Sequence, residues 1–273
     1  MSRMDEFVNK KRGMLFIPFI TAGDPTEDAT IELAAMLQSA GASALELGIP
    51  YSDPLADGPV IQKASQRALK HGMTLAGALR LCGRIREHGV TIPLIVFTYI
   101  NPLIQLGSKT FFQLAQENQV DGLLVPDLPF EESRELAQAC SMHHICLISL
   151  VAPTTSDKRL KAIAGSAQGF LYCVSSLGVT GVRKQFHPSV FPFLDRVRTV
   201  TDLPTAVGFG ISTSAQVDAL RSHADGFIVG SAIVSLIGER AERLSDRRTC
   251  SEAAAQIKRI LEERLLGQAV GNR

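Results

Sequence analysis

Two carboxylates fall within one short stretch whose pattern predicts a strand, a loop and a helix. Glu46 lies between Leu45 and Leu47, and alternation along the strand places it on the face opposite the two leucines. Asp57 follows in a loop rich in Pro and Asp, just before the Gly58-Pro59 pair that opens the helix. A carboxylate in an apolar strand is costly unless it is paired or used, so the two groups predict acid–base chemistry. The plainer alternatives are a structural ion pair for Glu46 and a turn or capping role for Asp57.

Glycine-containing segments follow the last two predicted strands. One runs from Gly208 to Ser212, and the other runs from Gly230 to Ile233 at the start of a short helix. Free backbone N–H groups and a helix N-terminus bind phosphate, and glycine lets the backbone approach a ligand closely. We therefore predict a phosphate site formed by both segments, with ordinary tight turns as the alternative.

Further lining groups are expected from a long connection and from aromatic residues. The segment 175–182 is longer than most strand-to-helix connections and rich in small residues, which favours a lid over a simple connection. Aromatic side chains near predicted strand ends are expected to line the same cavity, with core packing as the alternative: Phe19, Tyr99, Tyr172 and Phe209.

Several other chemistries find no support in the sequence. No His, Cys and carboxylate cluster has the spacing of a metal site, so no metal is expected. No Ser, His and Asp pattern appears, and no lysine stands out in a strand as a Schiff-base carrier. His143 and His144 precede the fifth predicted strand, which places them at the end of a barrel away from its site.

Composition indicates a globular cytoplasmic protein. The chain has 273 residues, 45% of them hydrophobic, and a net charge of +1, which gives no reason to expect nucleic acid or an anionic membrane as a partner. No apolar run is long enough to span a bilayer, and the first residues lack the apolar stretch of a signal peptide. The five cysteines show no CxxC spacing, which indicates reduced, buried thiols.

Apolar runs alternating with helical patterns predict eight parallel strands in one domain spanning residues 1–273. The predicted strands are 15–20, 44–47, 93–98, 120–125, 145–151, 169–174, 204–207 and 226–229. Extra helices are expected at the N-terminus and in the second and eighth strand–helix units. The count of eight and the late phosphate glycines favour an α/β fold of the (β/α)8 TIM barrel type over an open doubly wound sheet.

Two helix starts carry capping patterns. Asp24 precedes Pro25 at a predicted first helical position, with Glu27 three residues after the cap. Thr249 and Glu252 have the spacing of a capping box that opens the last helix.

The central stretch closely resembles the signature of the tryptophan synthase alpha subunit family. The match comprises Glu46, Gly48, the segment Tyr51-Ser52-Asp53-Pro54 and the segment Ala56-Asp57-Gly58-Pro59. Tyr51 stands where the family commonly has Phe. The resemblance covers nearly the whole chain and implies retro-aldol cleavage of indole-3-glycerol phosphate to indole and glyceraldehyde 3-phosphate.

The resemblance also implies individual roles. Glu46 would carry out both proton transfers, Asp57 would stabilise the indole ring, and Tyr172 would lie near the reacting atoms. Phe19 and Phe209 would pack on the indole ring. Thr180, in the Gly-Val-Thr-Gly loop, would meet Asp57. The phosphate site would comprise Gly181, Gly210, Gly230 and Ser231.

The family acts with a beta subunit in an alpha-beta-beta-alpha heterotetramer. The beta subunit takes up the indole and carries pyridoxal phosphate. No cofactor is expected in this chain. The implied interface residues are Asp53, Pro54, Asn101 and Pro129. Two alternatives remain: another phosphate-binding barrel enzyme, such as a sugar-phosphate isomerase or aldolase, and a non-catalytic barrel subunit that regulates its beta partner.

Overall fold

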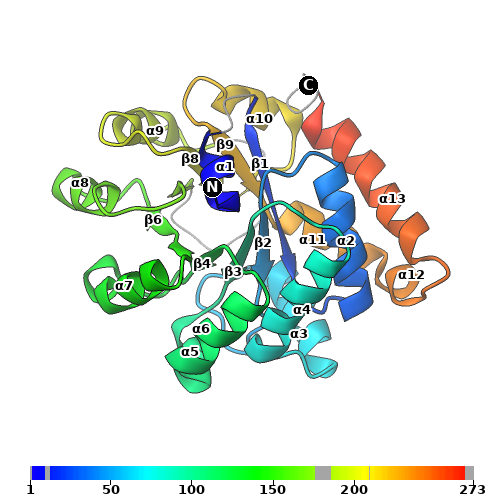
Figure 1. Ribbon diagram of the computed structural model, residues 1–273. Coiled ribbons are helices and arrows are strands. Elements are labelled where there is room, and N and C mark those ends of the chain that lie inside the picture. The colour runs from blue at the N-terminus through cyan, green and yellow to red at the C-terminus, as the bar shows by residue number, and fades with distance from the viewer. Residues whose placement is uncertain (1, 10–12, 176–185, 209, 268–273) are drawn as a thin grey trace.

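The computed structural model describes residues 2–9, 13–175, 186–208 and 210–267, and its centre is a parallel sheet (Figure 1). Its strands are β1 (Leu15–Thr21), β2 (Leu45–Gly48), β3 (Leu94–Phe97), β4 (Gly122–Leu124), β5 (Cys146–Leu147), β6 (Ser149–Val151), β7 (Leu171–Val174), β8 (Thr205–Gly208) and β9 (Gly226–Val229). Their order is β5-β4-β3-β2-β1-β9-β8-β7-β6, and every pairing is parallel.

The two outermost strands of this order are halves of one barrel strand. β5 pairs with β4 and β6 pairs with β7, and only Ile148 separates the halves along the chain. The Ile148 N–H still donates to the Leu123 carbonyl at 2.8 Å. The sheet therefore closes around eight strand positions, and the predicted (β/α)8 TIM barrel is confirmed.

Helices surround the barrel (Figure 1). They are α1 (Arg3–Asn9), α2 (Glu27–Ser39), α3 (Pro59–Lys70), α4 (Leu75–Glu87), α5 (Ile100–Leu106), α6 (Ser108–Glu117), the 3₁₀ turn η1 (Phe130–Glu132), α7 (Arg134–Met142), α8 (Asp157–Ala164), α9 (Val190–Arg198), α10 (Ser214–Leu220), α11 (Ser231–Glu239), α12 (Ala241–Ser245), α13 (Cys250–Leu261) and the π-helical turn η2 (Glu262–Leu266). The extra N-terminal helix and the extra helices after β2 and β9 are confirmed. α5 is a further helix that the sequence analysis missed.

The barrel interior is filled by apolar side chains from the strands and from their flanking residues, and α1 closes one end of it. Met4 and Phe7 of α1 join the interior cluster, and the Phe7 ring lies 5.7 Å from that of Phe170. Because this end is plugged, the open end of the barrel is the one where the strands terminate.

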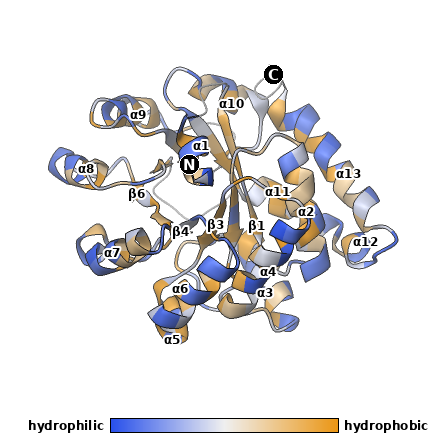
Figure 2. Cartoon of the chain, in the orientation of Figure 1, coloured by the Kyte–Doolittle hydropathy of each residue, from blue (hydrophilic) through white to orange (hydrophobic). Residues whose placement is uncertain are grey.

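A larger apolar cluster lies between the strands and the surrounding helices. In Figure 2 the strands are apolar, and hydrophilic residues gather on the outer faces of the helices. Among the residues that the structure describes, none of the helices combines the length and apolar character needed to cross a bilayer.

The predicted cap at Asp24 is wrong, because its carboxylate has another partner. Asp24 is 2% exposed and accepts two hydrogen bonds from Arg67 of α3, at 2.7 and 2.8 Å. Thr26 caps α2 instead, accepting a hydrogen bond from the Ala29 N–H at 3.1 Å. The Asp24–Arg67 pair therefore ties the turn after β1 to the helix that follows Asp57.

The predicted capping box at Thr249 is also wrong. Thr249 is the residue before α13, but its hydroxyl donates at 2.7 Å to the Arg243 carbonyl rather than accepting from the helix. A capping box does open α10, where Thr213 and Gln216 exchange the two expected hydrogen bonds.

Candidate active site

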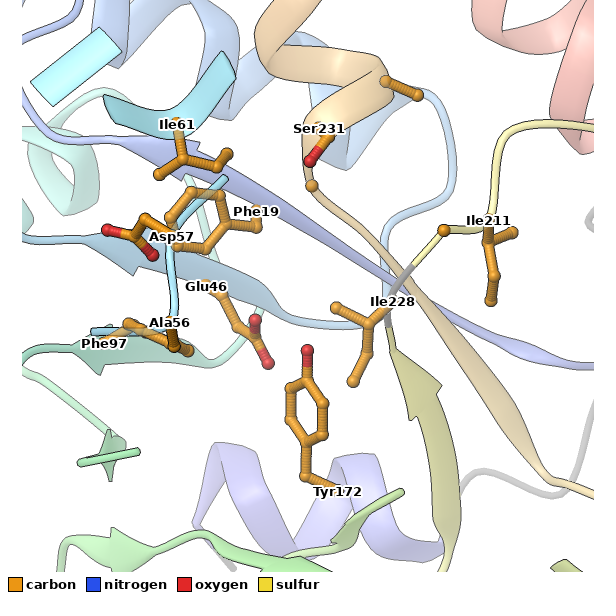
Figure 3. Close-up of a pocket in the computed structure, with 13 residues that line it drawn as sticks. Phe19, Glu46, Ala56, Asp57, Ile61, Phe97, Tyr172, Ile211, Ile228 and Ser231 are labelled. Carbon is orange, nitrogen blue, oxygen red and sulfur yellow. The ribbon is translucent and has the colours of Figure 1, made fainter. Parts of the chain in front are cut away.

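A cavity opens at the carboxyl end of the barrel strands, and both predicted carboxylates line it (Figure 3). Its lining residues are Phe19, Glu46, Ala56, Asp57, Ile61, Phe97, Tyr172, Gly210, Ile211, Ile228, Gly230, Ser231 and Ala232. The lining is thus an apolar and aromatic slot with a few polar groups, which is typical of a small-molecule site.

Glu46 lies on β2, paired in register with Phe19 of β1 and Ile95 of β3. It is 1% exposed, and its Oε1 atom has no hydrogen-bond partner among the residues that the structure describes. Burial raises its pKa from 4.5 to about 8, because a charge there would lose its hydration without gaining a counter-ion. Glu46 is therefore mostly a neutral acid at pH 7, able to donate a proton into the cavity.

Tyr172 of β7 faces this carboxyl group. Figure 3 shows its hydroxyl pointing toward the Glu46 side chain across the cavity. Burial, and to a smaller extent the charge of Glu46, raise the pKa of the Tyr172 phenol. The hydroxyl consequently stays protonated beside the carboxyl group.

Asp57 comes from the loop between β2 and α3. Burial raises its pKa from 3.8 to about 6, and a hydrogen bond from the Tyr99 hydroxyl opposes this rise. Asp57 is therefore mainly ionised at pH 7, whereas Glu46 is mainly protonated. Two carboxyl groups with separated pKa values suit an acid and an anion that act on one substrate.

Tyr99 was expected to line the cavity, but the structure places it behind the Asp57 loop. It is 2% exposed, and its oxygen accepts a hydrogen bond from the Ala56 N–H at 3.1 Å while its O–H donates to Asp57. The ring centroids of Tyr51 and Tyr99 lie 5.3 Å apart. Tyr99 thus holds the loop rather than forming a wall of the cavity.

Three residues predicted to bind phosphate line the cavity: Gly210, Gly230 and Ser231. Gly230 precedes α11, and Ser231 is the first residue of that helix, so the backbone N–H groups of its first turn have no partner within the helix and lie beside the cavity. Gly210 has a φ of +80°, a conformation that glycine adopts without strain. Figure 3 shows Ser231 on the side of the cavity opposite Tyr172.

Two glycines make room for the aromatic side chains. A Cβ atom on Gly48 would overlap the ring of Phe19, and a Cβ atom on Gly208 would overlap the hydroxyl end of Tyr172. Phe19 in turn meets Phe97 edge to face, at 5.5 Å between centroids. The positions of the two rings therefore depend on glycine, which has no Cβ atom, at these places in the neighbouring strands.

Other predicted residues lie apart from the cavity or outside the described chain. Asp53 and Pro54 lie on the β2–α3 loop, Asn101 lies on α5, and Pro129 lies before η1. Asp53, Asn101 and Pro129 are exposed. Thr180, Gly181 and Phe209 fall outside the described residues.

Several lining residues were not predicted from the sequence: Ala56, Ile61, Phe97 and Ile228. Phe97 was the easiest of these residues to predict, because it is the last residue of β3 and a barrel site forms at the strand ends. Ile211 and Ala232 line the cavity as well and belong to the two segments predicted to bind phosphate. No cluster of three or more His, Cys, Asp or Glu side chains in the described part of the chain is arranged to hold a metal ion.

Comparisons with known proteins agree on one family. The model of the family "Tryptophan synthase alpha chain" matches residues 6–263. The tryptophan synthase alpha chain of Halalkalibacterium halodurans is 58% identical over 263 residues, which cover 96% of this chain and 98% of that relative. The Bacillus subtilis strain 168 alpha chain is 55% identical over 244 residues, covering 89% and 91%.

Solved structures show the same likeness. A chain of the tryptophan synthase α2β2 complex from Pyrococcus furiosus superposes with a TM-score of 0.83 at 38% identity, covering 93% of this chain and 98% of its own length. The tryptophan synthase alpha chain of Legionella pneumophila gives a TM-score of 0.82 at 34% identity, covering 96% and 98%.

Proposed function

This chain belongs to the tryptophan synthase alpha chain family, and from that premise we propose that its cavity cleaves indole-3-glycerol phosphate to indole and glyceraldehyde 3-phosphate. The observation that carries the proposal is the buried carboxyl group of Glu46, which faces the cavity with no hydrogen-bond partner for Oε1 among the described residues. A buried polar group without a partner is costly, which favours use of the group over a structural role.

Glu46 is suited to both proton transfers of a retro-aldol cleavage. As the neutral acid it donates its proton to indole C3, which becomes tetrahedral while positive charge develops on the ring. As the resulting carboxylate it removes the proton from the side-chain hydroxyl next to the bond. The carbon–carbon bond then breaks, its electrons return to the ring as indole, and Glu46 regains its proton.

Asp57 stabilises the positive charge on the ring and accepts a hydrogen bond from the indole N–H. A carboxylate mainly ionised at neutral pH supplies a fixed negative charge where the substrate becomes positive. The aromatic rings of Phe19 and Phe97 offer apolar surface for indole. Tyr172 sits beside the acid.

The phosphate group binds at the N-terminus of α11, where Gly230 and Ser231 present backbone N–H groups and the helix dipole favours an anion. Gly210 lies on the same cavity. By resemblance, Thr180, Gly181 and Phe209 complete the substrate site.

The chain assembles with a tryptophan synthase beta subunit, as its structural relatives from Pyrococcus furiosus do in the α2β2 complex. We further propose that Asp53, Pro54, Asn101 and Pro129 contribute to that interface, that the beta subunit carries the pyridoxal phosphate, and that the pair acts in the cytoplasm. The exposed Leu55 (75%) and Ile104 (69%) lie near these residues in the sequence and add apolar surface of the kind that interfaces bury.

Indole release from indole-3-glycerol phosphate tests the proposal, with the purified chain alone and with a beta subunit added. Slow release alone and a large increase with the partner are expected. A folded chain that stimulates its beta partner but releases no indole in either case would instead be a regulatory subunit without its own chemistry.

A further inference from the structure

Asp127 caps a helix that belongs to a different strand–helix unit. It lies in the connection after β4, and its two carboxylate oxygens accept hydrogen bonds from the Ile100 N–H at 3.0 and 3.2 Å. Ile100 is the first residue of α5, and Tyr99, the residue at the cap position, makes no side-chain capping bond there. The start of α5 is therefore fixed from outside its own segment.

The residue beside that contact is Tyr99, which holds the catalytic loop. Its phenol oxygen accepts from the Ala56 N–H and its O–H donates to Asp57. Because a buried side chain follows its backbone, a shift at the start of α5 changes both hydrogen bonds.

A second contact joins the same loop to α5. The Asn101 amide donates to the Tyr51 hydroxyl at 3.0 Å, and Tyr51 in turn packs on the ring of Tyr99. Both contacts involve residues adjacent to Ile100, so the first turn of α5 is the platform for residues 51–57.

We propose that Asp127 is a positioning residue for the cleavage reaction, which fixes the Asp57 carboxylate through the first turn of α5 and the Tyr99 hydroxyl. Asp127 does not line the cavity, so its effect on the reaction passes through Tyr99. The inference rests on the proposed function, since Asp57 must act on the substrate for its position to matter.

The expected kinetic effect is on turnover rather than on substrate binding. The phosphate side of the cavity lies on α11 and is independent of α5. We therefore expect Asp127→Ala to lower kcat about tenfold or more, since small misplacements of catalytic groups cost factors of ten to a hundred, and to change KM less than about threefold.

The direction in which the pH profile shifts distinguishes a positioning role of Asp127 from a direct effect of its charge on Asp57. Among the described titratable groups, Tyr99 faces Asp57 from the position before α5, and Glu46 and Tyr172 share its cavity from β2 and β7. Loss of the Tyr99 hydrogen bond raises the pKa of Asp57, whereas loss of the negative charge of Asp127 alone lowers it. Asp127→Ala should therefore move the acid limb of the kcat profile to higher pH.

The test measures kcat, KM and their pH profiles for the wild type, Asp127→Ala, Asp127→Asn, Tyr99→Phe and the Asp127→Ala/Tyr99→Phe double variant. Asparagine keeps an oxygen acceptor for the Ile100 N–H, so Asp127→Asn should recover most of the turnover. The double variant should be no slower than Tyr99→Phe alone. Thr74→Ala is the matched control, because it removes a helix cap from α4, outside the cavity, where Thr74 accepts from the Gly77 N–H at 3.1 Å.

Three results would overturn the inference: turnover of Asp127→Ala equal to that of Thr74→Ala, Asp127→Asn as slow as Asp127→Ala, or multiplied losses in the double variant. Wild-type chain that releases no indole would instead refute the proposed function. Circular dichroism and urea unfolding check that each variant folds. If Asp127→Ala does not fold, Asp127→Ser replaces it, because the shorter serine side chain does not reach across to α5.

Discussion

Replacing Glu46 by glutamine removes a titrating group from the barrel interior while keeping its size, and we expect two opposite results. Turnover should be lost, because glutamine neither donates nor accepts the required proton. The folded state of the variant should be more stable than that of the wild type at alkaline pH. The wild type must either ionise a buried carboxyl group or keep it protonated at a pH where the unfolded chain is ionised, and the variant does neither.

The magnitude follows from the pKa of Glu46, which burial raises from 4.5 to about 8. Below pH 4.5 both states hold the proton and no penalty arises. Between 4.5 and about 8 the unfolded chain has lost its proton while the folded chain keeps it, so wild-type stability falls as pH rises and levels off above that interval. At about 1.4 kcal/mol per pH unit, the full loss is about 5 kcal/mol.

Urea unfolding followed by circular dichroism measures this loss as the difference in unfolding free energy between Glu46→Gln and wild type. We expect the difference to shift in favour of the variant by about 4 kcal/mol between about pH 5 and pH 9. Glu87→Gln, the same exchange at an exposed position, should show no such trend. A flat difference for Glu46→Gln, or substantial residual indole release, would refute the assignment of Glu46 as a buried neutral acid that serves catalysis.

Other substitutions test separate parts of the site. Asp57→Asn removes the charge that stabilises the ring, so kcat for indole release should fall at least about 100-fold with KM nearly unchanged; a loss below about threefold would contradict that role. Gly48→Ala pushes the Phe19 ring into the cavity, so kcat/KM should fall about tenfold or more with an unchanged circular dichroism spectrum. Asp24→Ala leaves Arg67 unpaired, so urea unfolding should show a loss of about 3 kcal/mol; a loss under about 1 kcal/mol would show that the pair is dispensable.

Local patterns predicted most of the barrel, because each strand and helix has its own periodicity. The strand Gly226–Val229 was predicted to the residue, and the Glu46 strand was recognised by one carboxylate between two leucines. The break at Ile148 was not predicted, since the apolar run 145–151 contains no Gly or Pro and looks continuous. Such a break depends on which neighbour each half pairs with, and that information lies in β4 and β7.

The contacts that hold the site were the least predictable from sequence. Asp24 looked like a helix cap because its partner, Arg67, lies 43 residues away. α5 was not predicted, although its Pro102 lies in the first turn, where a helix tolerates Pro. Without α5, nothing indicated that Tyr99 would hold Asp57 rather than line the cavity.

The two glycines that make room for aromatic rings stand in equivalent places on the barrel. Phe19 is in register with Glu46, and Gly48 lies two residues further on. Tyr172 is in register with Ala206, and Gly208 lies two residues further on. The same device is thus used twice, and it has a consequence for altering the substrate range. Shortening Phe19 opens space toward the backbone of β2 at Gly48, so a substituted indole gains room in that direction.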